Sequence, residues 1–149
     1  MKQHDPLQIL LELAQANSDS AAKAIGITCT REQKEQEKLQ MLINYRIDYQ
    51  NTFMQAVQQG VSPASLANYQ EFMKKLDLAV KQQADVVAHW RGQVAVSRQD
   101  WVDKQRQVKS FDTLTQRHQQ AEARREMRIE QRNQDEYAAR LFARANSEE

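Results

Sequence analysis

The chain has 149 residues, of which 40% are hydrophobic and 28% charged, with three glycines, two prolines and a formal net charge of +1. This length suits one ordinary domain, but so few glycines and prolines argue against a globular fold rich in turns. A net charge this close to zero gives no field that would recruit nucleic acid or an anionic membrane by itself. Any partner must therefore be bound by local surfaces.

The first predicted helix covers about residues 5–58. Asp5 can cap its N-terminus, and Pro6 fits the first helical position, where a backbone N–H is not needed. Inside this helix, fifteen positions spaced alternately four and three residues apart form a heptad pattern, and ten of them are apolar. Such a pattern is typical of a coiled-coil seam. The positions are Leu7, Leu11, Ala14, Ser18, Ala21, Ile25, Thr28, Glu32, Glu35, Leu39, Leu42, Arg46, Tyr49, Phe53 and Ala56.

A turn is predicted at about residues 59–62, followed by a second helix over about residues 63–143. Ser62 and Pro63 repeat the start signal of the first helix. A second heptad pattern has eleven apolar residues at its fifteen positions, which are Leu66, Tyr69, Met73, Leu76, Val80, Gln83, Val87, Trp90, Val94, Ser97, Trp101, Lys104, Val108, Phe111 and Thr115. If the chain folds back at Gly60, facing residues have numbers with a constant sum of 122, so that Phe53 faces Tyr69.

The two patterns predict an all-α fold, a long antiparallel two-helix coiled-coil hairpin that forms a single domain over residues 1–149. The second helix is longer than the first and overhangs it beyond about Thr115, where polar and charged residues continue the pattern. Residues 30–38 have no apolar side chain, and the register puts Glu35 beside Val87 and Glu32 beside Trp90. We expect the glutamate stems to cover these side chains, and this section to be more mobile than the end near the turn.

No pattern in the sequence predicts catalysis or a cofactor. The three glycines are isolated, which excludes a phosphate-binding loop. His118 and Glu122 are four residues apart, and we interpret them as an ordinary solvated pair because a zinc site needs three or four converging ligands. The single Cys29 excludes an internal disulfide and is compatible with a reducing cytoplasm. We therefore expect a cytoplasmic protein that is not an enzyme and holds neither cofactor nor metal.

Membrane insertion and nucleic-acid binding are not expected either. No stretch approaches the roughly 20 apolar residues of a membrane-spanning helix. The arginines after Thr115 are balanced by nearby glutamates and aspartates, and pairs at this spacing stabilise a solvated helix.

One flank of the seam near the predicted turn is more apolar than the other. It carries Tyr45 from the first helix, with Phe72, Ala79 and Val86 from the second. Two interpretations remain open. The rings widen the core, or they anchor a partner, since exposed aromatic clusters are typical of interfaces.

Several short segments occur in a characteristic order along the chain. They are Leu42-Ile43-Asn44-Tyr45 followed by Tyr49, then Asn68-Tyr69-Gln70-Glu71-Phe72, then Trp90 and Trp101, and finally Asp135-Glu136-Tyr137-Ala138-Ala139-Arg140. This series, which covers most of the chain, resembles the flagellar FliJ family of export proteins. The resemblance implies a two-helix hairpin similar to the coiled coil of the rotary ATP synthase γ subunit.

The resemblance implies a non-enzymatic component of the flagellar type III protein export apparatus. Such a protein is cytoplasmic and peripherally associated with the inner-membrane export apparatus at the flagellar base. It acts as a central stalk that promotes assembly and activity of the hexameric export ATPase ring. It also contacts the cytoplasmic domain of the membrane export gate protein and the flagellar export chaperones, which it helps to recycle.

The resemblance also implies two sets of binding residues. The family's gate-binding patch corresponds to Leu42, Tyr45, Tyr49, Phe72, Leu76 and Ala79, three of which lie on the apolar flank described above. Lys38 and Gln83 depart from the Gln and His expected at those family positions. The hairpin ends furthest from the turn would enter the ATPase ring, with Tyr137, Leu141 and Phe142 as anchors. The other interpretation of these three residues is a frayed terminal helix with incidental apolar side chains.

Two alternatives to the export stalk stay open. The same physical pattern fits the equivalent stalk of a virulence type III secretion system. It also fits a generic coiled-coil scaffold or export chaperone that has no ATPase partner.

Overall fold

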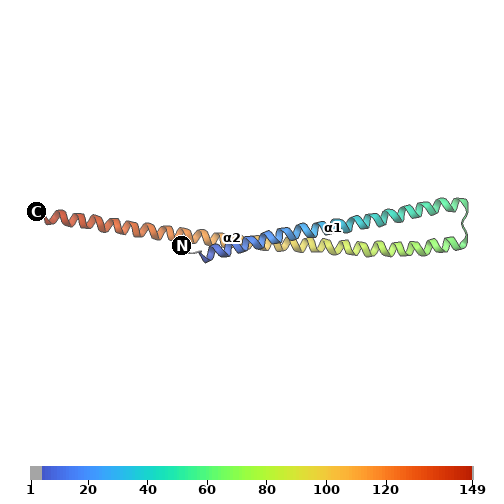
Figure 1. Ribbon diagram of the computed structural model, residues 1–149, viewed down its shortest axis with the longest axis horizontal. Coiled ribbons are helices and arrows are strands. Elements are labelled where there is room, and N and C mark those ends of the chain that lie inside the picture. Colours follow the sequence, from blue (N-terminus) through green and yellow to red (C-terminus); the bar gives the residue numbers. More distant parts are fainter. Residues whose placement is uncertain (1–4, 149) are drawn as a thin grey trace. The chain divides into compact units, whose positions relative to one another are not determined.

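The computed structural model describes residues 5–148, and these residues form two α-helices and no strand. Helix α1 covers Pro6–Gln59 and helix α2 covers Pro63–Ser147, joined by the short connection seen in Figure 1. The chain divides into two compact units. We call Ser18–Asp103 the hairpin unit, and Met1–Asn17 with Lys104–Glu149 the terminal unit. The predicted all-α fold is confirmed.

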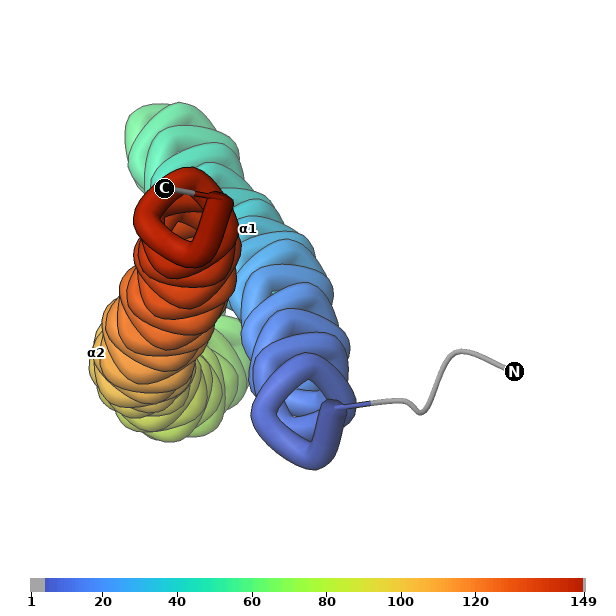
Figure 2. The backbone as a smooth tube through the Cα atoms, turned by 90° about the vertical axis from the view of Figure 1, so that its left-hand side faces the viewer, coloured from blue at the N-terminus to red at the C-terminus, as the bar shows by residue number. Residues whose placement is uncertain are grey.

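Within the hairpin unit, α1 and α2 lie side by side and run antiparallel (Figures 1 and 2). Near the turn, the rings of Phe53 and Tyr69 stack with their centroids 3.7 Å apart. Far from the turn, the hydroxyl of Thr28 donates a hydrogen bond to that of Ser97, with the oxygens 3.4 Å apart. As residue numbers fall along α1, those of the facing residues rise along α2. This register confirms the predicted antiparallel hairpin.

The helix ends follow the expected capping rules. The Asp5 carboxylate accepts a hydrogen bond from the N–H of Leu7 at 3.1 Å, and the Ser62 hydroxyl accepts one from the N–H of Ser65 at 3.1 Å. Both contacts satisfy N–H groups that have no partner inside the helix. Gly60 has a φ of +93°, which a residue with a Cβ rarely adopts, so the glycine permits the turn after α1.

The core of each unit is thin. The buried residues are Ser18, Ala21, Glu35, Leu76, Val87 and Val94 in the hairpin unit, and Ala14 and Thr115 in the terminal unit. Every one of them is a position of the two heptad patterns, so the described part of the chain has no buried residue outside the seam. A core this narrow leaves the remaining faces of both helices available for contacts with other molecules.

In the terminal unit, packing ends early along α2. Thr115 is its last buried residue, and each described residue from Gln116 onward is exposed. His118 lies near the beginning of α1, with its Nε2 atom 3.7 Å from an Asp5 carboxylate oxygen and 3.2 Å from one of Glu122. The remainder of α2 is a helix without a packing partner among the described residues. It must be stabilised by its own side-chain pairs or by another molecule.

Residues 30–38 make polar contacts that the heptad pattern did not predict. The Glu35 carboxylate accepts a hydrogen bond from the Gln83 amide. The guanidinium of Arg31 lies over the Trp90 ring, with its carbon 5.3 Å from the ring centroid. Glu35 and Gln83 therefore satisfy each other inside the seam. We call these two residues, with Arg31 and Lys38 at the exposed edge, the polar layer.

Candidate functional site

Five aromatic rings gather in the hairpin unit near the turn, and we call them the aromatic cluster: Tyr45, Tyr49, Phe53, Tyr69 and Phe72. The centroids of Tyr49 and Phe72 are 4.6 Å apart, and Tyr45 lies 6.4 Å from both of these rings. Distances of this size give each ring pair a favourable contact beyond simple burial. The cluster therefore forms one continuous aromatic surface across both helices.

The six residues of the predicted gate-binding patch do not share one environment. Tyr45 is 52% exposed, whereas Leu76 is only 7% exposed and belongs to the core. The other four, Leu42, Tyr49, Phe72 and Ala79, are half-buried. Both interpretations of the flank are thus present in part, because the rings widen the seam and Tyr45 still presents its ring to solvent.

A surface hollow adjoins Tyr45 on the same side of α1. It is lined by Lys38, Met41, Leu42, Asn44, Tyr45, Asp48 and Gln83. Met41 is 70% exposed and was missed in the sequence, although its position four residues before Tyr45 places both side chains on one helix face. Lys38 and Gln83, the two departures from the family pattern, both line this hollow.

Lys38 and Gln83 also meet at Glu35, which is 3% exposed. The Gln83 amide donates to the Glu35 carboxylate at 2.7 Å and to its backbone carbonyl at 2.9 Å. The ammonium of Lys38 and the guanidinium of Arg31 approach the same carboxylate at 3.4 and 3.2 Å. The hydrogen bond from Gln83, aided by the two cations, lowers the pKa of Glu35 despite the opposing effect of burial. Glu35 is therefore held ionised inside the seam.

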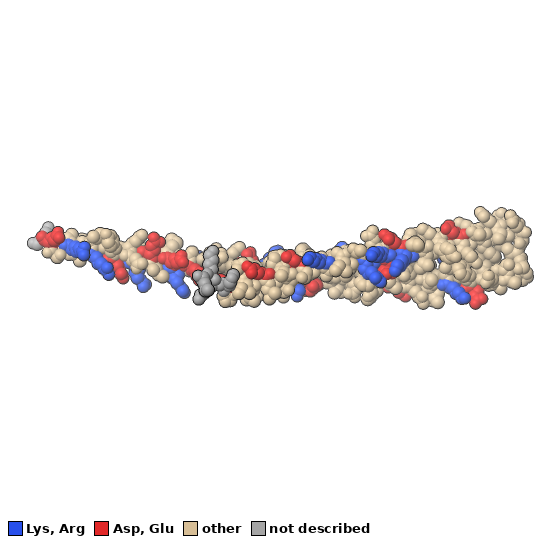
Figure 3. Space-filling view, viewed as in Figure 1, with Lys and Arg blue, Asp and Glu red and all other residues tan. Residues whose placement is uncertain are grey.

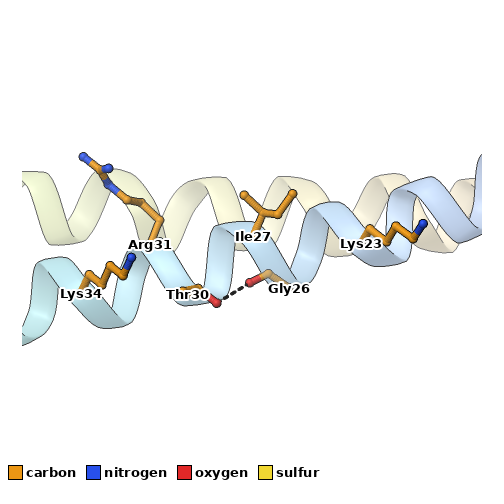
Figure 4. A pocket seen from close by; sticks show the side chains of 6 residues that line it. All are labelled: Lys23, Gly26, Ile27, Thr30, Arg31 and Lys34. Atoms are coloured by element: carbon orange, nitrogen blue, oxygen red, sulfur yellow. Dashed lines mark hydrogen bonds between the residues drawn. The ribbon is translucent and has the colours of Figure 1, made fainter.

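A second hollow lies on α1 away from the aromatic cluster, and Figure 4 shows the six residues that line it: Lys23, Gly26, Ile27, Thr30, Arg31 and Lys34. The short residues Gly26 and Thr30 create the hollow between longer neighbours. The Thr30 hydroxyl donates to the Gly26 carbonyl at 2.8 Å and is thereby turned back onto its own helix. Because one helix supplies every wall, the hollow is an open surface dent and not an enclosed ligand site.

The predicted anchors of the terminal unit are all accessible. Tyr137, Leu141 and Phe142 are 66%, 49% and 70% exposed. Tyr137 and Leu141 share a shallow surface with Arg140, Ala143 and Arg144, whereas Phe142 is not part of it. Two of the three residues thus form a common face, and Phe142 points to a different side of α2, as one residue of helical rotation requires.

The described residues provide no group of three or more metal-ligating side chains, and none of the described helices has the length and apolarity to cross a bilayer. The features that stand out are the aromatic cluster, the polar layer at Glu35 and the exposed end of α2. The aromatic cluster and the exposed end of α2 are suited to binding macromolecules, whereas the polar layer lies mostly inside the seam. They define the class of protein as a coiled-coil hairpin that works through contacts along its helices.

Comparison with known proteins gives the family. A family model described as "Flagellar FliJ protein" matches residues 2–147. The chain is 30% identical over 144 residues to the flagellar FliJ protein of Salmonella typhi and 29% identical to that of Escherichia coli strain K12, in each case over 97% of this chain and 98% of the relative. The chain belongs to the flagellar FliJ family, whose members are non-enzymatic components of the flagellar export apparatus.

Proposed function

We propose that this chain is a cytoplasmic stalk of the flagellar type III export apparatus that binds the hexameric export ATPase and promotes its assembly and activity. One observation carries the proposal. Every described residue of α2 after Thr115 is exposed, and yet this segment carries Tyr137, Leu141 and Phe142. A lone helix with large apolar side chains is suited to insertion into the central opening of a ring, which would supply the burial that the hairpin does not.

The test is the rate of ATP hydrolysis and the oligomeric state of the purified export ATPase, with and without this chain in stoichiometric excess. We expect a faster rate together with ring formation. Replacing Tyr137, Leu141 and Phe142 by Ser together should weaken both effects. Met127→Ser with Ile129→Ser is the matched control, because these residues are also exposed on the same segment. Equal loss in both variants, or no stimulation by the unaltered chain, would contradict the proposal.

The same proposal gives the aromatic cluster a second partner, the cytoplasmic domain of the membrane export gate protein. The supporting observation is that Tyr45 is half exposed while it remains in contact with Tyr49 and Phe72, so its ring is held in place before binding. A preordered ring loses little conformational freedom when a partner covers it. Leu76 would support the patch from inside the core and would not touch the gate protein.

The variant Tyr45→Ala tests whether the Tyr45 ring contributes to binding the gate protein or to folding of the hairpin. We expect it to weaken binding to the gate protein by at least tenfold in a titration, because interface aromatic anchors commonly contribute more than about 1.4 kcal/mol. Leu78→Ala is the control, since Leu78 is 56% exposed but is neither in the aromatic cluster nor in the adjacent hollow. If the two variants bind equally well, the patch is not the gate site. A large loss of helicity in Tyr45→Ala would assign this ring to the core.

Export chaperones are the third partner class in this proposal, and family membership is its support. If the ATPase is unaffected by the chain while chaperones or export substrates bind it, the scaffold or chaperone function replaces the stalk. The injectisome alternative is less favoured, because the family match and both relatives are flagellar.

A further inference from the structure

Helix α1 has a second heptad pattern that the hairpin does not use. Its eleven positions, spaced alternately four and three residues apart, are Ala22, Gly26, Cys29, Gln33, Gln36, Gln40, Ile43, Ile47, Gln50, Met54 and Val57. We call them the lateral stripe. Two are half-buried and nine are exposed, including Ile47 at 46% and Met54 at 58%. The stripe lies about 100° around the helix from the seam, so it faces sideways and away from α2.

The lateral stripe contains no charged residue, although 28% of the chain is charged. The corresponding flank of α2 is different. Between Gln70 and Val102 it carries Lys74, Asp77, Lys81, Arg91 and Arg98. Solvated helix faces usually carry mixed charge. A face that is uncharged over eleven positions with coiled-coil spacing is instead suited to a neighbouring helix.

We propose that the lateral stripe binds the same stripe of a second copy of this chain, in an antiparallel and two-fold symmetric contact. A second copy is proposed as the partner because the two ends of the stripe are complementary in side-chain size. Small residues occupy one end of the stripe, and large apolar residues occupy the other. An antiparallel register with facing numbers that sum to 83 places Gly26 opposite Val57 and Cys29 opposite Met54. The remaining pairs are Gln33 with Gln50, Gln36 with Ile47, and Gln40 with Ile43.

The space for this packing is present at Gly26. A Cβ placed there would meet no atom within 4 Å, and Figure 4 shows this bare position between longer side chains. A facing Val57 can therefore approach the helix backbone closely. A parallel arrangement would place the small residues together and the large residues together, which leaves a gap at one end and crowding at the other.

The charges beside the stripe are compatible with the antiparallel arrangement. Lys23 and Glu37 are the charged residues that border the stripe on its outer side. In the antiparallel register they lie opposite Gln58 and Asn44, which are uncharged. Like charges in facing positions oppose association. No such clash occurs in the proposed dimer.

The area of the proposed contact indicates how tightly the two copies would bind. The paired segment from Gly26 to Val57 would be about 48 Å long at 1.5 Å per residue, and a contact strip about 10 Å wide would bury on the order of 1,000 Å² in total. That area is at the lower end for specific interfaces. The dimer should therefore be reversible, with a dissociation constant in the micromolar range or weaker. It does not depend on the proposed export function.

Cysteine cross-linking tests the register directly. Met54→Cys places a thiol opposite Cys29 of the other copy, so mild oxidation should give a covalent dimer that dithiothreitol reverses. The double variant Met54→Cys with Cys29→Ser should stay monomeric on a non-reducing gel. Gln55→Cys, exposed one residue further along but on another face, is the matched control and should cross-link poorly. Cross-linking of the unaltered chain through Cys29 alone would indicate a parallel dimer and overturn the proposal.

Sedimentation over a concentration series tests the face without cysteine chemistry. Ile47→Lys, at the centre of the stripe, should raise the dissociation constant at least tenfold. Met41→Lys is the control, because Met41 is 70% exposed on the side of α1 that carries Tyr45. Equal circular dichroism spectra show that both variants remain folded. A chain that stays monomeric to several hundred micromolar, or equal weakening by both substitutions, would overturn the proposal.

Discussion

Two sections of the hairpin unit fill the space between α1 and α2 with different kinds of side chain. Near the turn, the aromatic cluster fills the space between the helices with five rings. Further from the turn, Glu35 and Gln83 of the polar layer occupy it, while Lys38 and Arg31 approach Glu35 from the exposed edge. Both sections use a heptad position where a coiled coil would ordinarily place an aliphatic residue. The comparison shows that regular spacing does not determine which kind of contact forms in the seam.

The two sections are also expected to serve different purposes. Rings gain by burial and by ring contacts, and they leave Tyr45 accessible to a partner. A buried charged group gains little net stability once its loss of hydration is included, but it specifies which residues must face each other. Figure 3 adds that the surface around the turn is almost free of Lys, Arg, Asp and Glu on the face shown. The turn end is thus suited to apolar contacts, and the polar layer to fixing the register.

The largest expected effect lies in the apolar seam between these sections. Leu76→Ala should lower the free energy of unfolding by roughly 2–4 kcal/mol, because it removes buried methyl groups and leaves a cavity. Leu78→Ala should change it by less than about 0.5 kcal/mol, since Leu78 is 56% exposed. Urea denaturation followed by circular dichroism at 222 nm measures both. Similar losses in the two variants would mean that the seam does not dominate stability.

A smaller effect is expected in the polar layer. Gln83→Ala removes the amide that donates to Glu35 and should lower stability by about 1 kcal/mol. It should also raise the pKa of Glu35 toward its ordinary value, because the hydrogen bond from Gln83 is the largest cause of the lowered value. The exposed neighbour Gln82 provides the control variant Gln82→Ala. Carbon-detected NMR titration of the glutamate carboxyls measures the pKa of Glu35. An unchanged value in Gln83→Ala would mean that Gln83 does not lower this pKa.

Much of this architecture could be predicted from the sequence. Alternating spacings of four and three, Gly60 and the capping residues Asp5 and Ser62 are local signals, so the two helices and their antiparallel pairing followed directly. Every buried residue is a predicted heptad position, but the heptad positions Ala56, Leu66 and Trp101 are exposed, so the pattern predicted burial only in part. These properties depend on periodicity, which a single sequence displays fully.

The partners of individual long side chains could not be predicted in the same way. Periodicity placed Glu35 beside Val87, but four flexible torsions in Lys38 or Arg31 and three in Gln83 allow many contacts from one backbone. The hollow beside Tyr45 was missed for a related reason. Met41 lies outside the seam pattern, and it lines the same hollow as Gln83 of the other helix. Surfaces formed by two helices require the packed geometry, whereas the seam does not.

The pH dependence of stability distinguishes the polar layer from the aromatic cluster. Because the pKa of Glu35 is lowered in the folded chain, its ionised form contributes stability that is fully present above the ordinary value of 4.5. This contribution is lost as the pH falls from about 4.5 through the folded pKa. Thermal melts of the unaltered chain and of Glu35→Gln, measured from pH 7 to pH 3, should converge at low pH. Parallel melting curves over the whole range would assign the acid sensitivity to other carboxylates.

The smallest change in stability is expected when the polar layer is replaced as a whole. Glu35→Leu with Gln83→Leu removes both hydrogen-bonding groups at once and leaves neither unpaired, so stability should stay close to that of the unaltered chain or rise. Gln83→Leu alone should be destabilising, because Glu35 then loses its closest donor inside the seam. If the polar layer fixes the register, the double variant should also show broader NMR signals or alternative cross-links between α1 and α2, while Leu76→Ala should not. A double variant that is both more stable and uniquely packed would mean that the aliphatic seam and the aromatic cluster determine the register by themselves, and the contrast between the two sections would then concern binding alone.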